Sequence, residues 1–256
     1  MRDLNVTLVQ QPLAWQDPAA NRARFAELLA PLAGRTDLVV LPEMFTTGFS
    51  MQAGALAEGM DGPSVEWLRA TAAGLGAVVT GSVIVADGGY RNRLLWARPD
   101  GTLAHYDKRH LFRMAREHEH YAAGERRLVV ELHGWRVLPL VCYDLRFPVW
   151  SRNRDDYDLA VYVANWPAAR RYAWTALLRA RAIENLACVV GVNRVGTDGA
   201  GIEYAGDSVA LDALGQPLAD LGAAAAVTQV TFSAEALANH RRRFPAHLDA
   251  DAFRLE

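Results

Sequence analysis

Short apolar runs rich in β-branched residues alternate along the chain with longer segments whose apolar residues recur at helical spacing. The strand-like runs occupy residues 5–10, 36–43, 136–144, 158–166 and 188–196, and the helical segments occupy residues 19–33, 64–76 and 170–187. Short strands that alternate with helices are typical of α/β proteins. The pattern therefore predicts an α/β fold, with a mixed sheet or a pair of sheets flanked by helices.

Turn and cap signals refine this pattern. Asp87-Gly88-Gly89 and Pro99-Asp100-Gly101 interrupt the strand-like region 77–108 and indicate β-hairpins, and residues 207–222 are typical of a strand followed by another hairpin. For the helix at 64–76, we expect Ser64 as N-cap and Gly74 or Gly76 as its stop.

The alternation continues without a Pro/Ser/Gly-rich linker or a low-complexity tract. We therefore expect residues 1–256 to form a single domain.

Composition narrows the classes of partner. With 51% hydrophobic and 22% charged residues and a formal net charge of -2, the chain lacks the basic excess of a dedicated nucleic-acid-binding protein. No apolar stretch approaches the roughly 18 residues of a membrane span, and the N-terminal segment does not resemble a signal peptide. Only two cysteines are present, which indicates a reducing compartment. We expect a cytoplasmic protein without a nucleic-acid or membrane partner.

Polar residues follow three of the predicted strands, where sites assemble in α/β architectures. Glu43, Cys142 and the Asn165-Trp166 pair each come at such a strand end. Each also has a simpler interpretation, because a strand-terminal glutamate can bond loop amides and a free cysteine can fill a core. Cys188, with apolar neighbours on both sides, is interpreted as a core residue.

A nucleophilic thiol needs a base or a neighbouring cation. None of the seven histidines stands at a strand end that could face Cys142, and residues 117–120 (EHEH) lack the spacing of a metal motif. No metal site is expected. A glutamate and a lysine can instead supply base and cation. Lys108, between a strand and a semi-apolar segment, is a candidate for that cation or a surface residue.

A dinucleotide-binding site is a weak alternative. Residues 74–81 (GLGAVVTG) contain two spaced glycines, but Val79 occupies the third glycine position of the G-x-G-x-x-G pattern. An oxidoreductase is therefore disfavoured.

Three motifs in a fixed order resemble those of the nitrilase (carbon-nitrogen hydrolase) superfamily. They are LPEMFTTGF at 41–49, YDKRHLF at 106–112 and VCYDLRFP at 141–148, and the segments NWP, LLRARAIEN, NRVG and AGDS extend the similarity over nearly the whole chain. The resemblance implies the four-layer α-β-β-α sandwich of this superfamily, a homodimer and a Glu-Lys-Cys triad formed by Glu43, Lys108 and Cys142.

Residues 106–125 and 165–196 are most similar to the omega-amidase branch, particularly its bacterial members. This resemblance implies hydrolysis of the terminal amide of 2-oxo dicarboxylate monoamides, such as 2-oxoglutaramate and 2-oxosuccinamate, without a cofactor. In such proteins a second glutamate lies seven residues before a glycine. Glu117, seven residues before Gly124, matches it better than Glu119.

The resemblance also suggests a role for each side chain. Glu43 removes the proton of the Cys142 thiol, and the thiol attacks the amide carbon. Lys108 and the backbone N–H of Tyr143 hold the oxyanion. Water then hydrolyses the thioester, activated by Glu43 with assistance from Glu117.

A substrate with a free carboxylate needs a cation. Arg146, four residues after the cysteine, and Arg113 are the candidates, although Arg146 is equally compatible with a structural ion pair to Asp144 or another carboxylate. Trp166 and Phe49 are expected to line the pocket.

Two alternatives remain open. The first keeps the chemistry and changes the substrate: a nitrilase, a carbamoylase or a simple aliphatic amidase. The second is a catalytically silent binding protein on the same fold.

Overall fold

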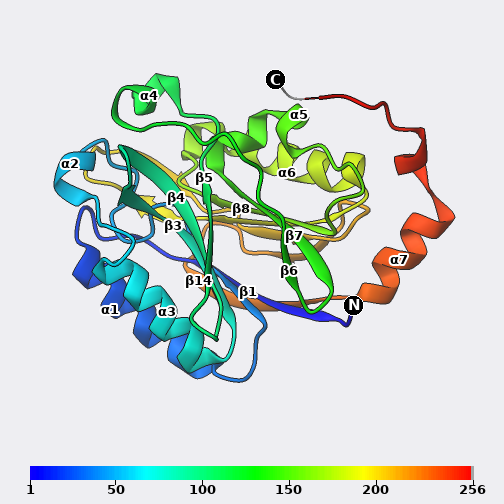
Figure 1. Cartoon of the computed structure of the whole chain (residues 1–256), viewed down its shortest axis with the longest axis horizontal. Helices are drawn as coiled ribbons and strands as arrows, with labels where there is room; N and C mark the ends of the chain where they lie inside the picture. Colours follow the sequence, from blue (N-terminus) through cyan, green and yellow to red (C-terminus); the bar gives the residue numbers. More distant parts are fainter. Residues whose placement is uncertain (255–256) are drawn as a thin grey trace.

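The computed structural model describes residues 1–254, which form two stacked six-stranded sheets with helices on the outer faces (Figure 1). The first sheet has the order β14 (Ala226–Phe232), β1 (Leu4–Gln10), β2 (Leu38–Val40), β3 (Val78–Ala86), β4 (Tyr90–Ala97) and β5 (Leu103–Asp107). The second has the order β13 (Pro217–Asp220), β12 (Val209–Leu211), β9 (Cys188–Asn193), β8 (Leu159–Ala164), β7 (Trp135–Val141) and β6 (Val130–Leu132). The hairpin of β10 (Val195–Thr197) and β11 (Glu203–Ala205) stands apart from both. The predicted α-β-β-α sandwich is confirmed.

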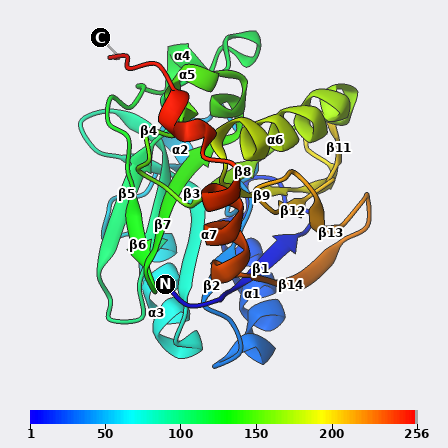
Figure 2. The ribbon, with the colours of Figure 1, turned by 90° about the vertical axis from the view of Figure 1, so that its right-hand side faces the viewer.

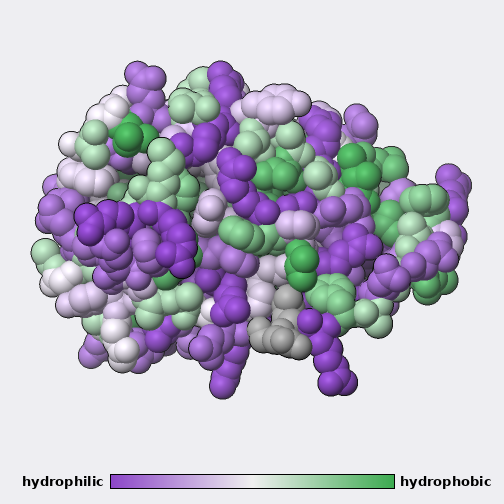
Figure 3. Space-filling model, turned by 90° about the horizontal axis from the view of Figure 1, so that it is seen from above, coloured by the Kyte–Doolittle hydropathy of each residue, from purple (hydrophilic) through white to green (hydrophobic). Residues whose placement is uncertain are grey.

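Three long helices form the outer layers. α1 (Pro18–Leu29) and α3 (Pro63–Leu75) cover the first sheet, and α6 (Arg171–Asn185) covers the second (Figures 1 and 2). The remaining helices are α2 (Ala53–Leu56), α4 (Glu117–His120), α5 (Pro148–Ser151) and α7 (Ala234–Arg243), with 3-10 turns η1 (Ala30–Leu32), η2 (Arg113–Ala115), η3 (Cys142–Arg146), η4 (Ala168–Arg170) and η5 (Ala246–Asp249). None of the described helices is both long and apolar enough to cross a membrane. Figure 3 shows hydrophilic residues mixed with smaller hydrophobic groups on the upper face of the molecule.

The alternation of side chains along each strand explains the layers. In β1, Val6 and Leu8 point into the core between the sheets, whereas Val9 packs on the side of α1 and α3. The parallel strands β7, β8 and β9 are buried on both faces, which is why they appear in the sequence as continuous apolar runs. Gly191 in β9 lets α6 approach closely, because a Cβ there would lie 2.5 Å from Leu178.

Several boundary predictions differ from the structure, among them the strand expected at 136–144, which ends as β7 at Val141 where η3 begins. The strand expected at 36–43 ends as β2 at Val40, because Pro42 has no N–H to continue a ladder. Ser64 is not the N-cap of α3: the cap is Gly62, and Pro63 takes the first helical position. The Ser64 backbone N–H and hydroxyl each donate to Glu58 at 2.6 Å, so the side chain of a residue in the preceding loop caps this helix. The stop at Gly76, where φ is +65°, is confirmed.

A buried carboxyl group, Asp144, joins the end of β5 to the turn after β7. It accepts hydrogen bonds from the Tyr106 hydroxyl (2.8 Å) and from the backbone N–H groups of Val141 and His110 (3.0 Å each). His110 Nδ1 lies 2.8 Å from the same side chain. Asp144 therefore fixes the segments that carry Lys108 and Cys142 relative to each other.

We expect Asp144→Ala to lower the free energy of unfolding by about 3–5 kcal/mol, because the substitution leaves several buried donors without an acceptor. Urea denaturation measures this change. Glu27→Ala, at an exposed position on α1, is the control and should change the free energy by less than about 0.5 kcal/mol. Equal stability of the two variants would contradict the assigned role of Asp144.

Candidate active site

Four strand ends converge at one edge of the sandwich. β2 lies parallel between β1 and β3, and two successive antiparallel pairings bring β5 into the same direction as β3, so Glu43 and Lys108 both follow strands that end at this edge. In the second sheet β7 and β8 are parallel, and Cys142 and Asn165 are the residues directly after them. The candidate site therefore lies between the carboxyl ends of strands from both sheets, where α/β folds place ligands.

At the centre of the site, Lys108 contacts two carboxylates. Its Nζ donates to Glu43 Oε1 at 2.9 Å and to both carboxylate oxygens of Glu117 at 2.9 and 3.0 Å. All three side chains are fully buried, and Lys108 is the only lysine in the sequence. Glu119 is exposed and pairs with Arg116, so Glu117 rather than Glu119 lies next to the predicted triad.

Amide groups bind the remaining carboxylate oxygens. Asn92 Nδ2 lies 2.8 Å from Glu43 and 3.2 Å from Glu117, and it bridges the two. The Asn165 N–H donates to Glu43 Oε2 at 2.8 Å, and the Phe112 N–H donates to Glu117 Oε2 at 2.6 Å. Charges buried without such partners would be strongly unfavourable.

The backbone behind Lys108 requires a glycine at position 124. The Gly124 N–H donates to the Lys108 carbonyl at 2.9 Å, and a Cβ on Gly124 would lie 2.1 Å from the Asp107 carbonyl oxygen. Any other residue would push this segment away from β5. The glycine therefore keeps the loop that carries Glu117 close to Lys108.

Cys142 occupies a sharp strand-to-helix turn. Its φ is +45°, a left-handed conformation that is costly for a residue other than glycine, and it begins η3 directly after β7. Its Sγ is 3.9 Å from the Asn165 carbonyl oxygen. Such turns expose a nucleophile at the end of a strand.

The electrostatic environment keeps this thiol protonated. Burial raises the pKa of Cys142 well above its ordinary value, and the negative charge of Glu43 raises it further, whereas Lys108 lowers it. For Lys108, burial lowers the pKa, but Glu117 and Glu43 together outweigh it, so the pKa is raised and the amine stays an ammonium. Burial also raises the pKa of Glu117, against the lowering effect of Lys108. A neutral thiol therefore lies close to an ammonium and two carboxyl groups.

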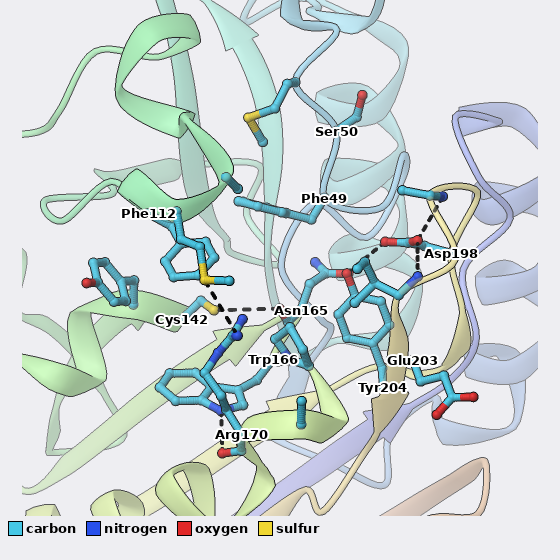
Figure 4. Close-up of a pocket in the computed structure, with 18 of the residues that line it drawn as sticks. Phe49, Ser50, Phe112, Cys142, Asn165, Trp166, Arg170, Asp198, Glu203 and Tyr204 are labelled. Atoms are coloured by element: carbon cyan, nitrogen blue, oxygen red, sulfur yellow. Dashed lines mark hydrogen bonds between the residues drawn. The ribbon is translucent and has the colours of Figure 1, made fainter.

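A cavity of about 770 Å³ opens onto Cys142 and Lys108 (Figure 4). Of the other predicted residues, Tyr143, Arg146, Trp166 and Phe49 also line it. Glu43 and Glu117 lie behind the lining, in contact with Lys108.

Arg113 and Arg146 lie in different surroundings. Arg113 is exposed at the start of η2 and is absent from the lining among residues 1–254, although its neighbours Phe112 and Met114 contribute to it. Arg146 stacks on Trp166, with its guanidinium carbon 5.0 Å from the ring centroid, and it does not pair with Asp144.

The sequence interpretation missed two residues of the site. Asn92 lies in β4, and its only signal was an amide beside two arginines in a hairpin strand. Arg170 lines the cavity from η4, but in the sequence it is one of several arginines around a helix. Within residues 1–254, no three His, Cys, Asp or Glu side chains are grouped so as to hold a metal ion.

Comparisons with known proteins agree on the family. The model of the carbon-nitrogen hydrolase family matches residues 5–242. The omega-amidase YafV of Escherichia coli K12 is 53% identical over 257 residues, covering 100% of both chains. The 2-oxoglutaramate amidase of Bacillus subtilis is 30% identical over 250 residues, covering 95% of this chain and 96% of the relative.

A solved structure gives the same result. The chain resembles XC1258 from Xanthomonas campestris, with a TM-score of 0.99 and 58% identity over 100% of both chains. That protein is described as a CN-hydrolase superfamily member with an arsenic adduct in its active site. The chain therefore belongs to the carbon-nitrogen hydrolase family.

Proposed function

We propose that this protein is an omega-amidase, which hydrolyses the terminal amide of 2-oxo dicarboxylate monoamides such as 2-oxoglutaramate to the acid and ammonia. The main structural support is that Cys142 and Lys108 line one cavity, with Glu43 and Glu117 directly behind the ammonium. The relatives named omega-amidase and 2-oxoglutaramate amidase match nearly the whole chain and support this choice of substrate.

In the first half of the proposed reaction, the Glu43 carboxylate takes the proton of the Cys142 thiol as sulfur attacks the amide carbon. A base is needed because the raised pKa of Cys142 leaves little thiolate at neutral pH. The negative oxygen of the tetrahedral intermediate is held by the Lys108 ammonium and the backbone N–H of Tyr143. The proton returns to the amide nitrogen, the C–N bond breaks and ammonia leaves a thioester.

In the second half, a water molecule enters where ammonia left. Glu43 removes its proton, the oxygen attacks the thioester carbon, and the same two donors hold the new oxyanion. The C–S bond then breaks and the thiol recovers the proton. Glu117 assists by keeping Lys108 charged and in place, which its two contacts of 2.9 and 3.0 Å support.

A silent binding protein is a weaker candidate. Three ionisable side chains without exposure to solvent are costly to bury, and a well-packed apolar core is often more stable than such a cluster. A fold that retains them at the base of a cavity, beside a strained cysteine, is typical of a functional site.

The proposal extends to the assembly of the protein and its location in the cell. We infer a homodimer from the family resemblance, and exposed apolar side chains such as Val149, Tyr172 and Ile183 support a protein contact. A cytoplasmic location suits an enzyme whose Cys142 and Cys188 are both free thiols.

A substrate panel tests the function. We expect turnover of 2-oxoglutaramate, measured as ammonia released, with much lower rates for N-carbamoyl amino acids and simple nitriles. Cys142→Ala should abolish this turnover, because the proposed thioester forms on the Cys142 sulfur. Preference for a carbamoyl compound would replace the omega-amidase with a carbamoylase, and normal turnover by Cys142→Ala would reject the mechanism.

Lys108→Arg should lower kcat by at least about 10²-fold although it keeps the positive charge. A guanidinium is larger and planar, so it cannot contact both carboxylates and still reach the oxyanion as a compact ammonium does. The assay is steady-state kinetics with circular dichroism to confirm folding. A folded Lys108→Arg variant with nearly normal kcat would show that charge alone is sufficient.

Glu43→Gln should reduce kcat by about 10²- to 10⁴-fold. The same substitution should lower the pKa of Cys142, so the thiolate forms more easily although the reaction is slower. The negative charge of Glu43 raises that pKa, so its removal leaves Lys108 to favour the thiolate. Rates of alkylation by iodoacetamide, followed from about pH 6 to 10 by mass spectrometry, give the midpoint. Both proteins should carry Cys188→Ala. An unchanged or higher midpoint in Glu43→Gln would contradict the proposed coupling.

A further inference from the structure

Three cations line the cavity, and they are not equivalent. Lys108 already contacts two carboxylates, which neutralise its positive charge, so it is a poor partner for a carboxylate of the substrate. Arg146 and Arg170 are the others, and among residues 1–254 neither guanidinium has a carboxylate within ion-pair distance. An unpaired cation in a substrate cavity can bind an anionic group of the ligand.

Arg170 is held firmly at its base. Its backbone N–H donates to the Pro167 carbonyl at 2.9 Å, and its own carbonyl accepts a hydrogen bond from Trp166 Nε1 at 2.9 Å. The side chain extends from η4 toward Phe112, with the guanidinium carbon 5.1 Å from the ring centroid and Nη1 3.9 Å from Met114 Sδ (Figure 4). Its surroundings are thus aromatic and thioether groups, which leave its N–H donors available.

The neighbouring Arg171 provides a contrast. It begins α6 and binds Asp207 through two contacts of 2.7 and 3.0 Å, and it does not line the cavity. Two consecutive arginines therefore differ in function: one is neutralised by a carboxylate of the protein, and the other faces the cavity without one.

Arg146 is a weaker candidate than Arg170. It is exposed and lies over the face of Trp166, whereas Arg170 is half-buried. Water competes less for a partly buried cation, so an ion pair there is stronger than one at the surface.

The charges of the cavity walls also favour binding of the substrate carboxylate near Arg170. Asp198, Glu203 and Tyr204 belong to or adjoin the β10–β11 hairpin, and Figure 4 shows them on the opposite side of the cavity from Phe112 and Arg170. A substrate carboxylate would be repelled by Asp198 and Glu203 and attracted toward η4. Asp198 accepts a hydrogen bond from the Tyr204 hydroxyl at 2.8 Å, which holds this acidic wall in place.

Resting on the proposed omega-amidase function, we propose that Arg170 binds the carboxylate of the substrate and selects short amides that carry a carboxylate at the end opposite to the amide. Arg113 then has no direct role, and Arg146 packs on Trp166 and shapes the wall. Arginine suits this role because its planar fork binds both oxygens of a carboxylate.

Two substrates that differ only in the carboxylate test this assignment. They are 2-oxoglutaramate and 4-oxopentanamide, in which a methyl group replaces the carboxylate. Arg170→Met should lower kcat/KM for 2-oxoglutaramate by about 10- to 100-fold, mainly through KM, and change kcat/KM for 4-oxopentanamide by less than about threefold. Arg170→Lys should retain part of the activity on 2-oxoglutaramate.

Arg171→Met is the matched control and should leave both substrates within about twofold, with thermal melts showing that each variant folds. The proposal is wrong if Arg170→Met lowers kcat/KM equally for both substrates, if it lowers neither, or if Arg146→Met alone removes the preference for the carboxylate. Absence of 2-oxoglutaramate turnover in the unmodified enzyme is a different result, because it rejects the proposed function itself.

Discussion

The site depends on one buried ion cluster, in which a single ammonium holds two carboxylates. Lys108 contacts Glu43 and Glu117 with no exposure of any of the three side chains. Removing the lysine would leave two uncompensated buried charges, and such a loss typically costs about 3–5 kcal/mol. Every other basic residue apart from histidine in the sequence is an arginine. The chain therefore uses lysine only where a compact ammonium, rather than a planar guanidinium, must fit between two carboxylates.

Several elements of the fold are needed to bring the members of this buried ion cluster together. Lys108 and Glu43 follow strands of the first sheet, Cys142 follows a strand of the second, and Glu117 begins α4, in the segment that Gly124 holds against β5. Asp144 then joins the two sheets by binding Tyr106 and His110 on one side and Val141 on the other. The sandwich thus provides rigid strand ends from both sheets, and buried hydrogen bonds set the distance between them.

The elements that follow from local patterns were predictable, and those that depend on long-range contacts were not. Glu43 and Cys142 each follow a clear apolar strand, so their candidate status was visible along the chain. Lys108 follows β5, which is only partly apolar, and its place in the predicted triad came from the family resemblance. Ser64 was misread for a local reason: Pro63 takes the first helical position, and Glu58 in the preceding loop supplies the capping carboxylate. Asn92 and Arg170 have ordinary neighbours in sequence, and only the pairing of β4 with β5 and the position of η4 bring them to the site.

The charge balance of the cluster also explains why Cys142 is a neutral thiol despite an ammonium nearby. Two carboxylates already exceed the charge of Lys108, so a resting thiolate would be a third anion in a buried site. In the proposed reaction, proton transfer from Cys142 to Glu43 leaves the total charge unchanged, because one carboxylate is neutralised as the sulfur becomes anionic. The negative charge then moves to the substrate oxygen, within the same field of Lys108. These charges therefore support the proposed mechanism, in which attack is coupled to proton transfer, over one with a preformed thiolate, since a neutral thiol is a poor nucleophile.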